Sequence, residues 1–127
     1  MRKTKVYDLS LLIFRVGISL SMLTHGYQKL THLLEGNSSF ANPIGFGETF
    51  TLYLAILSEF VAPLFVIVGY KARFASVLPF MTMIVAALIV HAGDPFAKQE
   101  LALLYAAAFF IVFMIGPGKI SLDRKLK

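Results

Sequence analysis

Residues 9–30 read LSLLIFRVGISLSMLTHGYQKL, and the architecture of the chain follows from this segment. It is long enough to cross a bilayer, because a membrane-spanning helix needs about 20 mainly apolar residues. It also carries three basic side chains, Arg15, His25 and Lys29. With about 100° of rotation per helical residue, all three fall within a stripe about 80° wide. Since ionisable groups are costly in hydrocarbon, this stripe is predicted to face a bundle interior or a water-filled cavity.

The composition is that of an integral membrane protein with a single domain. The chain has 127 residues, of which 57% are hydrophobic and 15% charged, and its mean hydropathy is +0.75. Soluble domains are about 25% charged. The net charge of +5 does not indicate a nucleic-acid partner, because the cations lie in the tails and one short connection. The absence of cysteine excludes dithiol chemistry, iron–sulfur clusters and cysteine zinc sites within this chain.

Four apolar segments predict four membrane-spanning helices joined by polar connections. Asp94 is predicted to cap the last helix, with Pro95 as its first residue. Gly17 and Ser21 form a small-xxx-small pair, which predicts that another helix approaches closely there. Pro63 removes a hydrogen bond from the carbonyl of Glu59 and favours a kink. The expected spans are about 8–30, 49–69, 74–91 and 95–115 within one domain, 1–127.

The distribution of lysine and arginine predicts the orientation of these spans. Both tails and the connection with Lys71 and Arg73 hold nine of the twelve cations. Four spans place all three regions on one side of the membrane, and the positive-inside rule assigns that side to the cytoplasm. The sequence therefore predicts an all-α, four-helix transmembrane bundle with both termini cytoplasmic and the lipid bilayer as its main contact.

Glu59 lies near the middle of the second span, and its partner is an open question at the level of sequence. Helix rise of about 1.5 Å per residue places Arg15 and Glu59 both near the membrane centre. We therefore expect an Arg15–Glu59 ion pair, with a Glu59–His25 pair as the alternative. Such a pair can serve a ligand site, or it can be structural and specify how the first two spans pack.

The candidate ligand site combines these side chains with groups near the predicted outer surface. His25 and Lys29 are one helical turn apart and can act on the same ligand. His91 can face them across the bundle, with Glu100 at the mouth of the site, although His91 is favoured as a cap of its own turn. A histidine can donate a hydrogen bond to a quinone carbonyl, and a histidine pair can ligate haem. A quinone is favoured over haem, and the scattered histidines do not indicate a metal site.

These segments resemble the DoxX family of small membrane proteins. LAILSEFVAPLFVIVG is similar to the family's second helix, with its central glutamate at Glu59. HAGDPF resembles the turn between the third and fourth helices, and KQELALLYAAAFFIVFMIGPGKISLD resembles the last helix and the ending. LLIFRVGISLSMLTHGYQKL is similar to the first helix, whose matching residues here are Arg15, His25, Gly26, Lys29 and Leu30.

The resemblance implies a four-helix protein of a prokaryotic cytoplasmic membrane. Relatives include small membrane subunits of thiosulfate:quinone oxidoreductase, and others are linked to redox stress or to membrane chaperoning. The absence of cysteine argues against thiol exchange by this chain alone. A partner redox subunit would then supply thiols or flavin.

Three functions are compatible with the sequence. The first is a redox-associated membrane subunit whose outward-facing site holds a quinone or a similar small ligand. In that case Arg15 and Lys29 stabilise a developing quinol anion, while His25 or Glu59 transfers the proton. The second is a non-enzymatic assembly factor or scaffold that contacts partners through residues 31–48. The third is a carrier of a small anion or lipid, which would need to form a homo-oligomer. Whether the chain is itself an enzyme stays open.

Overall fold

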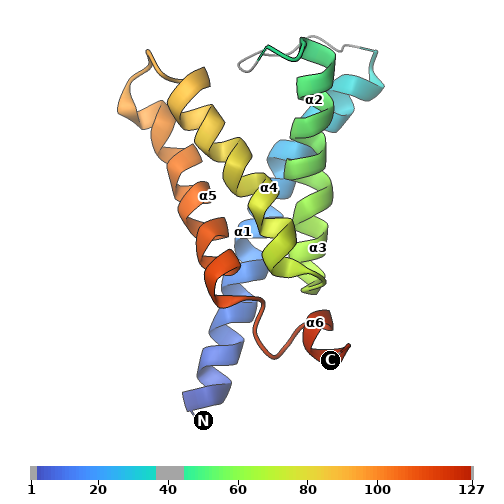
Figure 1. The fold of residues 1–127 in the computed structure, drawn as a ribbon, viewed down its shortest axis with the longest axis vertical. Helices are drawn as coiled ribbons and strands as arrows, with labels where there is room; N and C mark the ends of the chain where they lie inside the picture. Colours follow the sequence, from blue (N-terminus) through green and yellow to red (C-terminus); the bar gives the residue numbers. More distant parts are fainter. Residues whose placement is uncertain (1–2, 37–44, 127) are drawn as a thin grey trace.

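The computed structural model describes residues 3–36 and 45–126, and every regular element among them is helical. Figure 1 shows both chain termini at the same end of the molecule, which we call the terminal end. The opposite end carries residues 35–36, 45–47 and 91–95, and we call it the loop end. Four helical segments of the described chain are long and apolar enough to cross a membrane. The predicted four-helix, all-α architecture is confirmed.

Two of the four spanning segments change from α-helical to π-helical geometry along their length. The second combines α2, η1 and α3, and the third combines α4 and η2, where η marks a π-helical stretch. The helices in chain order are α1 (Lys3–Leu34), α2 (Glu48–Ile56), η1 (Leu57–Val61), α3 (Ala62–Val68), α4 (Ala72–Val85), η2 (Ala86–Val90), α5 (Phe96–Ile115) and the short α6 (Leu122–Lys125). η1 ends just before Pro63, so the expected irregularity of this helix takes the form of a π-helical turn.

Both ends of α1 and the start of α5 differ from the predicted spans. α1 extends beyond 8–30 at both ends, because its polar terminal turns remain helical where the apolar run has stopped. α5 begins at Phe96, and no side chain caps it. The prediction that Asp94 caps this helix is wrong, because the Asp94 carboxylate instead contacts His91 Nδ1 at 2.8 Å.

The helices form two arms that meet near the terminal end and diverge toward the loop end (Figure 1). One arm pairs α1 with the α2–η1–α3 segment, and the other pairs α4 with α5. α4 also packs against α3, which joins the arms, whereas α1 and α5 make few contacts. This arrangement leaves space between the arms at the loop end.

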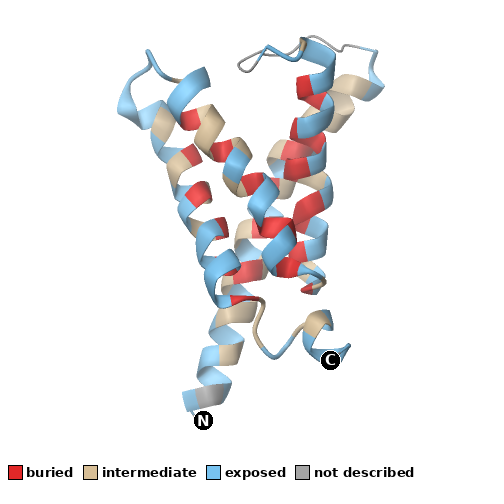
Figure 2. Cartoon of the chain, in the orientation of Figure 1, coloured by how far each residue is buried: buried red, intermediate tan, exposed pale blue. Residues whose placement is uncertain are grey.

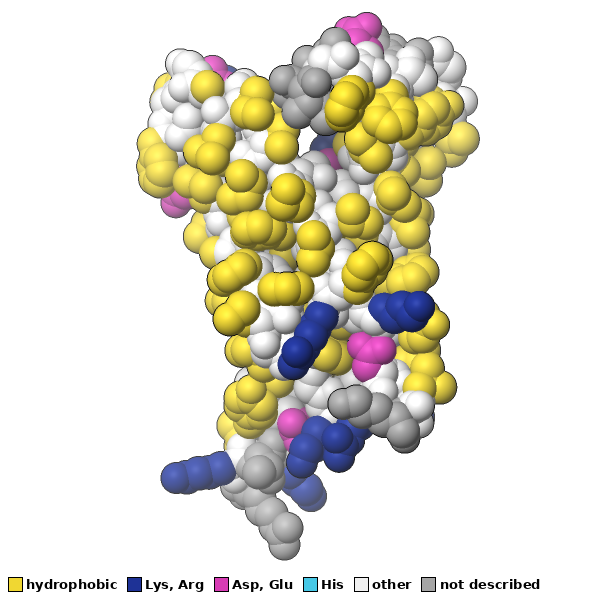
Figure 3. Space-filling view, viewed as in Figure 1, with side chains coloured by type: hydrophobic (Ala, Val, Ile, Leu, Met, Phe, Trp, Pro, Cys, Tyr) yellow, Lys and Arg dark blue, Asp and Glu magenta, His cyan; other side chains and the backbone are white. Residues whose placement is uncertain are grey.

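The interior between the helices is narrow and built largely from small residues. Figure 2 shows the buried residues on the facing sides of the helices, with exposed residues around the outside. Met22, Val66 and Phe109 are fully buried, together with a set of alanines that let the helices approach closely: Ala62, Ala72, Ala75, Ala87, Ala102 and Ala106. Large apolar side chains such as Phe74 and Leu104 face outward. Hydrophobic side chains cover most of the face seen in Figure 3, as contact with lipid requires.

The close helix approach lies at Gly26 and not at the predicted Gly17. A Cβ atom on Gly26 would lie 2.3 Å from the carbonyl oxygen of Glu59, so α1 and η1 meet backbone to backbone. A Cβ on Gly17 would meet nothing within 4 Å. Gly17 is exposed, because the buried face of α1 passes through Arg15, Ser19, Met22 and Gly26. No helix of the described chain approaches Gly17 closely, so the predicted close contact is not found at this residue.

The segment after α5 folds back beneath the bundle at the terminal end. Asp123 holds it there, since its carboxylate oxygens accept hydrogen bonds from the backbone amides of Lys71 (2.7 Å) and Ala72 (3.0 Å). Its own amide donates to the Gly69 carbonyl at 2.9 Å. Asp123 therefore caps α4 from a distant part of the chain.

Candidate functional site

Glu59 forms an ion pair with Lys29 across the α1–η1 contact. The Glu59 side chain is 3% exposed, whereas that of Lys29 is 26% exposed. Glu59 pairs with neither Arg15 nor His25, so both predicted partners are wrong. The reason is the crossing of α1 and η1 at Gly26, one helical turn from Lys29, which brings Glu59 to Lys29 and not to Arg15.

Arg15 lies about 21 Å along α1 from Lys29, toward the terminal end. It is 3% exposed, and its guanidinium donates hydrogen bonds to three carbonyl oxygens. The acceptors are Pro117 (2.5 Å), Ile120 (3.0 Å) and Ile67 (3.0 Å). Arg15 therefore ties the segment after α5 and the end of α3 to α1.

The Lys29–Glu59 pair lines a cavity of about 170 Å³, the loop-end cavity. It lies between the two arms, and Figure 3 shows basic and acidic side chains set back in the opening between them. Its polar wall contains His25, Lys29, Glu59, His91, Lys98 and Tyr105. Its apolar wall contains Met22, Met83, Ala86, Leu101 and Ala102. Four of the six predicted ligand-site residues therefore lie around one cavity, while Arg15 and Glu100 do not line it.

In the lining of the cavity, the ring of His25 on α1 contacts the ring of Tyr105 on α5. Their rings meet edge to face, with centroids 5.6 Å apart and an interplanar angle of 83°. This packing orients the imidazole and places a phenol beside it in the cavity wall. Both side chains can donate or accept hydrogen bonds.

His91 combines the two roles that the sequence left open. Its Nδ1 contacts the Asp94 carboxylate at 2.8 Å, and its carbonyl accepts a hydrogen bond from Gln99 Nε2 at 2.7 Å. These contacts stabilise the turn before α5. The same residue also lines the loop-end cavity.

The part of α5 that lines the cavity was not predicted. Lys98, Leu101, Ala102 and Tyr105 are spaced by three and four residues and therefore share one helix face. Glu100 is about 200° from Lys98 around the helix, so it faces away and is exposed. This helical spacing was available in the sequence and would have identified Lys98 and Tyr105 in place of Glu100.

Both π-helical stretches reach the cavity. Glu59 belongs to η1 and Ala86 to η2, and each lines the loop-end cavity. A π-helical turn leaves part of the usual backbone hydrogen bonding unmade and often occurs at functional sites. Thr82 Oγ1 donates a hydrogen bond to Ser58 Oγ at 2.8 Å, which joins α4 to η1 just below the site.

Comparison with known proteins supports the predicted family. The DoxX family model matches residues 10–92, which is more than half of the chain. The chain belongs to the DoxX family. The matched region of this DoxX protein includes Lys29, Glu59 and His91 of the loop-end cavity.

A curated relative agrees with a location in the membrane. Inner membrane protein YqjF of Escherichia coli (strain K12) is 26% identical over 128 residues, which cover 96% of this chain and 95% of that protein. No solved structure matches this chain. With four helices that can span a bilayer, this DoxX protein is a multi-pass protein of the cell membrane, as predicted.

Proposed function

We propose that the loop-end cavity binds the head group of a membrane quinone, and that this DoxX protein is a membrane subunit of an oxidoreductase. The observation that carries the proposal is the convergence of hydrogen-bonding side chains on a small cavity with an apolar wall. A volume of about 170 Å³ suits one ring-sized group and is too small for a porphyrin. Met22, Met83 and Ala102 supply apolar surface for the faces of such a ring.

The polar residues match the needs of a quinone carbonyl. Lys29, His25 and Tyr105 line the cavity and can donate hydrogen bonds. A bound quinone takes up two electrons and two protons when it becomes a quinol. Lys29 would stabilise negative charge on the ring oxygen, and His25 or Glu59 would exchange the proton. A partner subunit is the proposed source of electrons, through thiols or flavin, because this chain has no cysteine.

The test is quinone binding by the protein purified in mild detergent. Bound quinone is extracted and quantified before and after incubation with ubiquinone-1. We expect near-stoichiometric binding that falls about tenfold or more in His25→Phe, because a hydrogen-bond partner in the cavity wall is lost. Phenylalanine retains a ring to pack against Tyr105, so the variant should stay folded. Glu100→Gln, outside the cavity, should bind as the wild type does.

Two results would count against this proposal. A wild-type protein that neither carries quinone nor takes up ubiquinone-1 would overturn it. Unchanged binding by His25→Phe would remove His25 from the site.

A further inference from the structure

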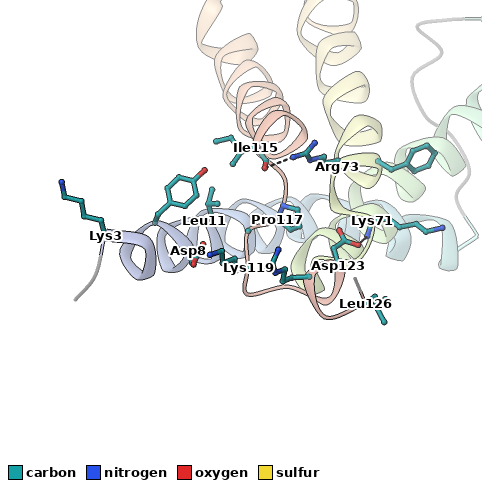
Figure 4. Close-up of a pocket in the computed structure, with 14 residues that line it drawn as sticks. Lys3, Asp8, Leu11, Lys71, Arg73, Ile115, Pro117, Lys119, Asp123 and Leu126 are labelled. Carbon is teal, nitrogen blue, oxygen red and sulfur yellow. Dashed lines mark hydrogen bonds between the residues drawn. The ribbon is translucent and has the colours of Figure 1, made fainter.

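A second hollow lies at the terminal end, and we call it the terminal groove. Its volume is about 1030 Å³. Figure 4 shows its walls, which come from the first turns of α1, the start of α4, the end of α5 and the segment that follows α5. It is at the opposite end of the bundle from the loop-end cavity, so the two sites are independent.

Specific hydrogen bonds hold the walls of the terminal groove in place. Arg15 binds the carbonyls of Pro117 and Ile120, and Asp123 binds the amides at the start of α4. Arg73 Nη2 donates to the Ile115 carbonyl at 3.2 Å, as Figure 4 shows. These hydrogen bonds fix the segment after α5 against α1 and α4, so the groove has a defined shape.

The terminal groove is strongly basic. Its described lining includes two acids, Asp8 and Asp123, and five cations: Lys3, Lys71, Arg73, Lys119 and Arg124. The Asp123 carboxylate already accepts two backbone hydrogen bonds. The guanidinium of Arg73 has five N–H groups, of which the bond to Ile115 uses one.

Apolar side chains lie between these cations. Leu11, Ile115 and Pro117 line the groove, and Figure 4 shows them between Lys3 and Arg73. Phe74 and Leu126 also line it and are 77% and 66% exposed. Phe74 and Ile115 continue onto the outward apolar surface of α4 and α5, which is the surface suited to acyl chains.

We propose that the terminal groove binds an anionic phospholipid of the adjacent leaflet. Arg73, Lys119 and Arg124 contact the phosphate head group, and the acyl chains follow Phe74 and Ile115 onto the lipid-facing surface. Basic pockets between helices near a membrane surface suit anionic head groups. The continuous apolar wall favours a phospholipid over free phosphate, which has no apolar part.

The test is native mass spectrometry of the full chain in detergent with equimolar dioleoyl phosphatidylglycerol and dioleoyl phosphatidylcholine. We expect the wild type to retain phosphatidylglycerol preferentially. In the double variant Lys119→Gln/Arg124→Gln the preference for phosphatidylglycerol should fall at least about fivefold. Each cation near an anionic head group raises the affinity for it by about that factor. Neither side chain makes a hydrogen bond or ion pair with the rest of the described chain, so folding should be retained. Lys5→Gln, an exposed cation outside the groove, is the matched control.

A second measurement separates a phospholipid from a phosphate ion. Inorganic phosphate at millimolar concentration should leave retention of phosphatidylglycerol unchanged. Displacement of the lipid by inorganic phosphate, equal retention of the two lipids, or an unchanged preference in the double variant would each overturn the proposal.

Discussion

At the scale of single residues, Glu59 shows what a carboxylate requires inside a bilayer. Its side chain is 3% exposed, and Lys29 supplies the opposite charge. A buried ion pair offsets desolvation only partly, but removal of one partner leaves an uncompensated charge. The pair joins α1 to η1, and both of its side chains line the loop-end cavity.

We expect Lys29→Met to destabilise the protein by about 3–5 kcal/mol, because the buried Glu59 carboxylate loses its ammonium partner. The double variant Lys29→Met/Glu59→Met should recover most of this loss, since both charges are then absent. Thermal unfolding in mild detergent measures both effects, and Glu48→Gln is a control at an exposed glutamate of the same span. A double variant less stable than Lys29→Met would contradict a direct stabilising pair.

Arg15 is the residue whose observed partners differ most from the predicted one. A mid-membrane arginine is expected to find a carboxylate, yet the two terminal nitrogens of Arg15 donate to three backbone carbonyls, and its buried Nε has no hydrogen-bond partner in the described chain. Carbonyls at helix ends and turns lack helical partners and are strong acceptors for a guanidinium. Arg15 thus joins α1 to α3 and to the segment after α5 at the terminal end.

At the scale of elements, the contact between α1 and η1 depends on Gly26. A Cβ at this position would also lie 2.5 Å from the Glu59 carbonyl carbon and 2.7 Å from the Phe60 amide nitrogen. These are backbone atoms, so they cannot move aside as a flexible side chain can. The helices would have to separate, and the Lys29–Glu59 pair spans the same contact.

We expect Gly26→Ala to lower the free energy of unfolding by about 1–3 kcal/mol through overpacking. Gly17→Ala is the matched control on the same helix. A Cβ there meets nothing within 4 Å, and alanine favours a helix over glycine by about 0.5–1 kcal/mol, so this variant should be neutral or more stable. Thermal unfolding in detergent gives the comparison. Equal stability of the two variants would show that the close approach at Gly26 is not maintained in solution.

At the scale of the whole molecule, the two ends differ in charge. The terminal end carries Lys71 and Arg73 beside both basic tails, and the loop end carries Glu48, Asp94 and Glu100. The positive-inside rule therefore predicts a cytoplasmic terminal end. The loop-end cavity would then open to the opposite side of the membrane.

The absence of cysteine makes this orientation directly measurable. Single cysteines are introduced as Gly93→Cys at the loop end and Lys125→Cys at the terminal end, both exposed positions. A membrane-impermeant maleimide on intact spheroplasts should label Gly93→Cys and should label Lys125→Cys only after permeabilisation. The reverse pattern would invert the orientation.

The architecture could be predicted from the sequence because it depends on local properties. Apolar length determines which segments can cross a bilayer, and the backbone must satisfy its own hydrogen bonds there, so helices result. Arg15, His25 and Lys29 were correctly identified as polar groups that need an interior environment. For the same reason the resemblance to the DoxX family could be recognised from short segments in order.

The partners of Arg15 and Lys29 depend on how the helices pack against one another, which the sequence pattern does not give. Residue spacing places Arg15 and Lys29 on one stripe, but it does not give the depth at which η1 crosses α1. Gly26 sets that crossing, and it brings Glu59 to Lys29 while Arg15 meets the segment after α5. The terminal groove likewise depends on Asp123 reaching the start of α4. Such contacts join residues far apart in the chain, so no local pattern encodes them.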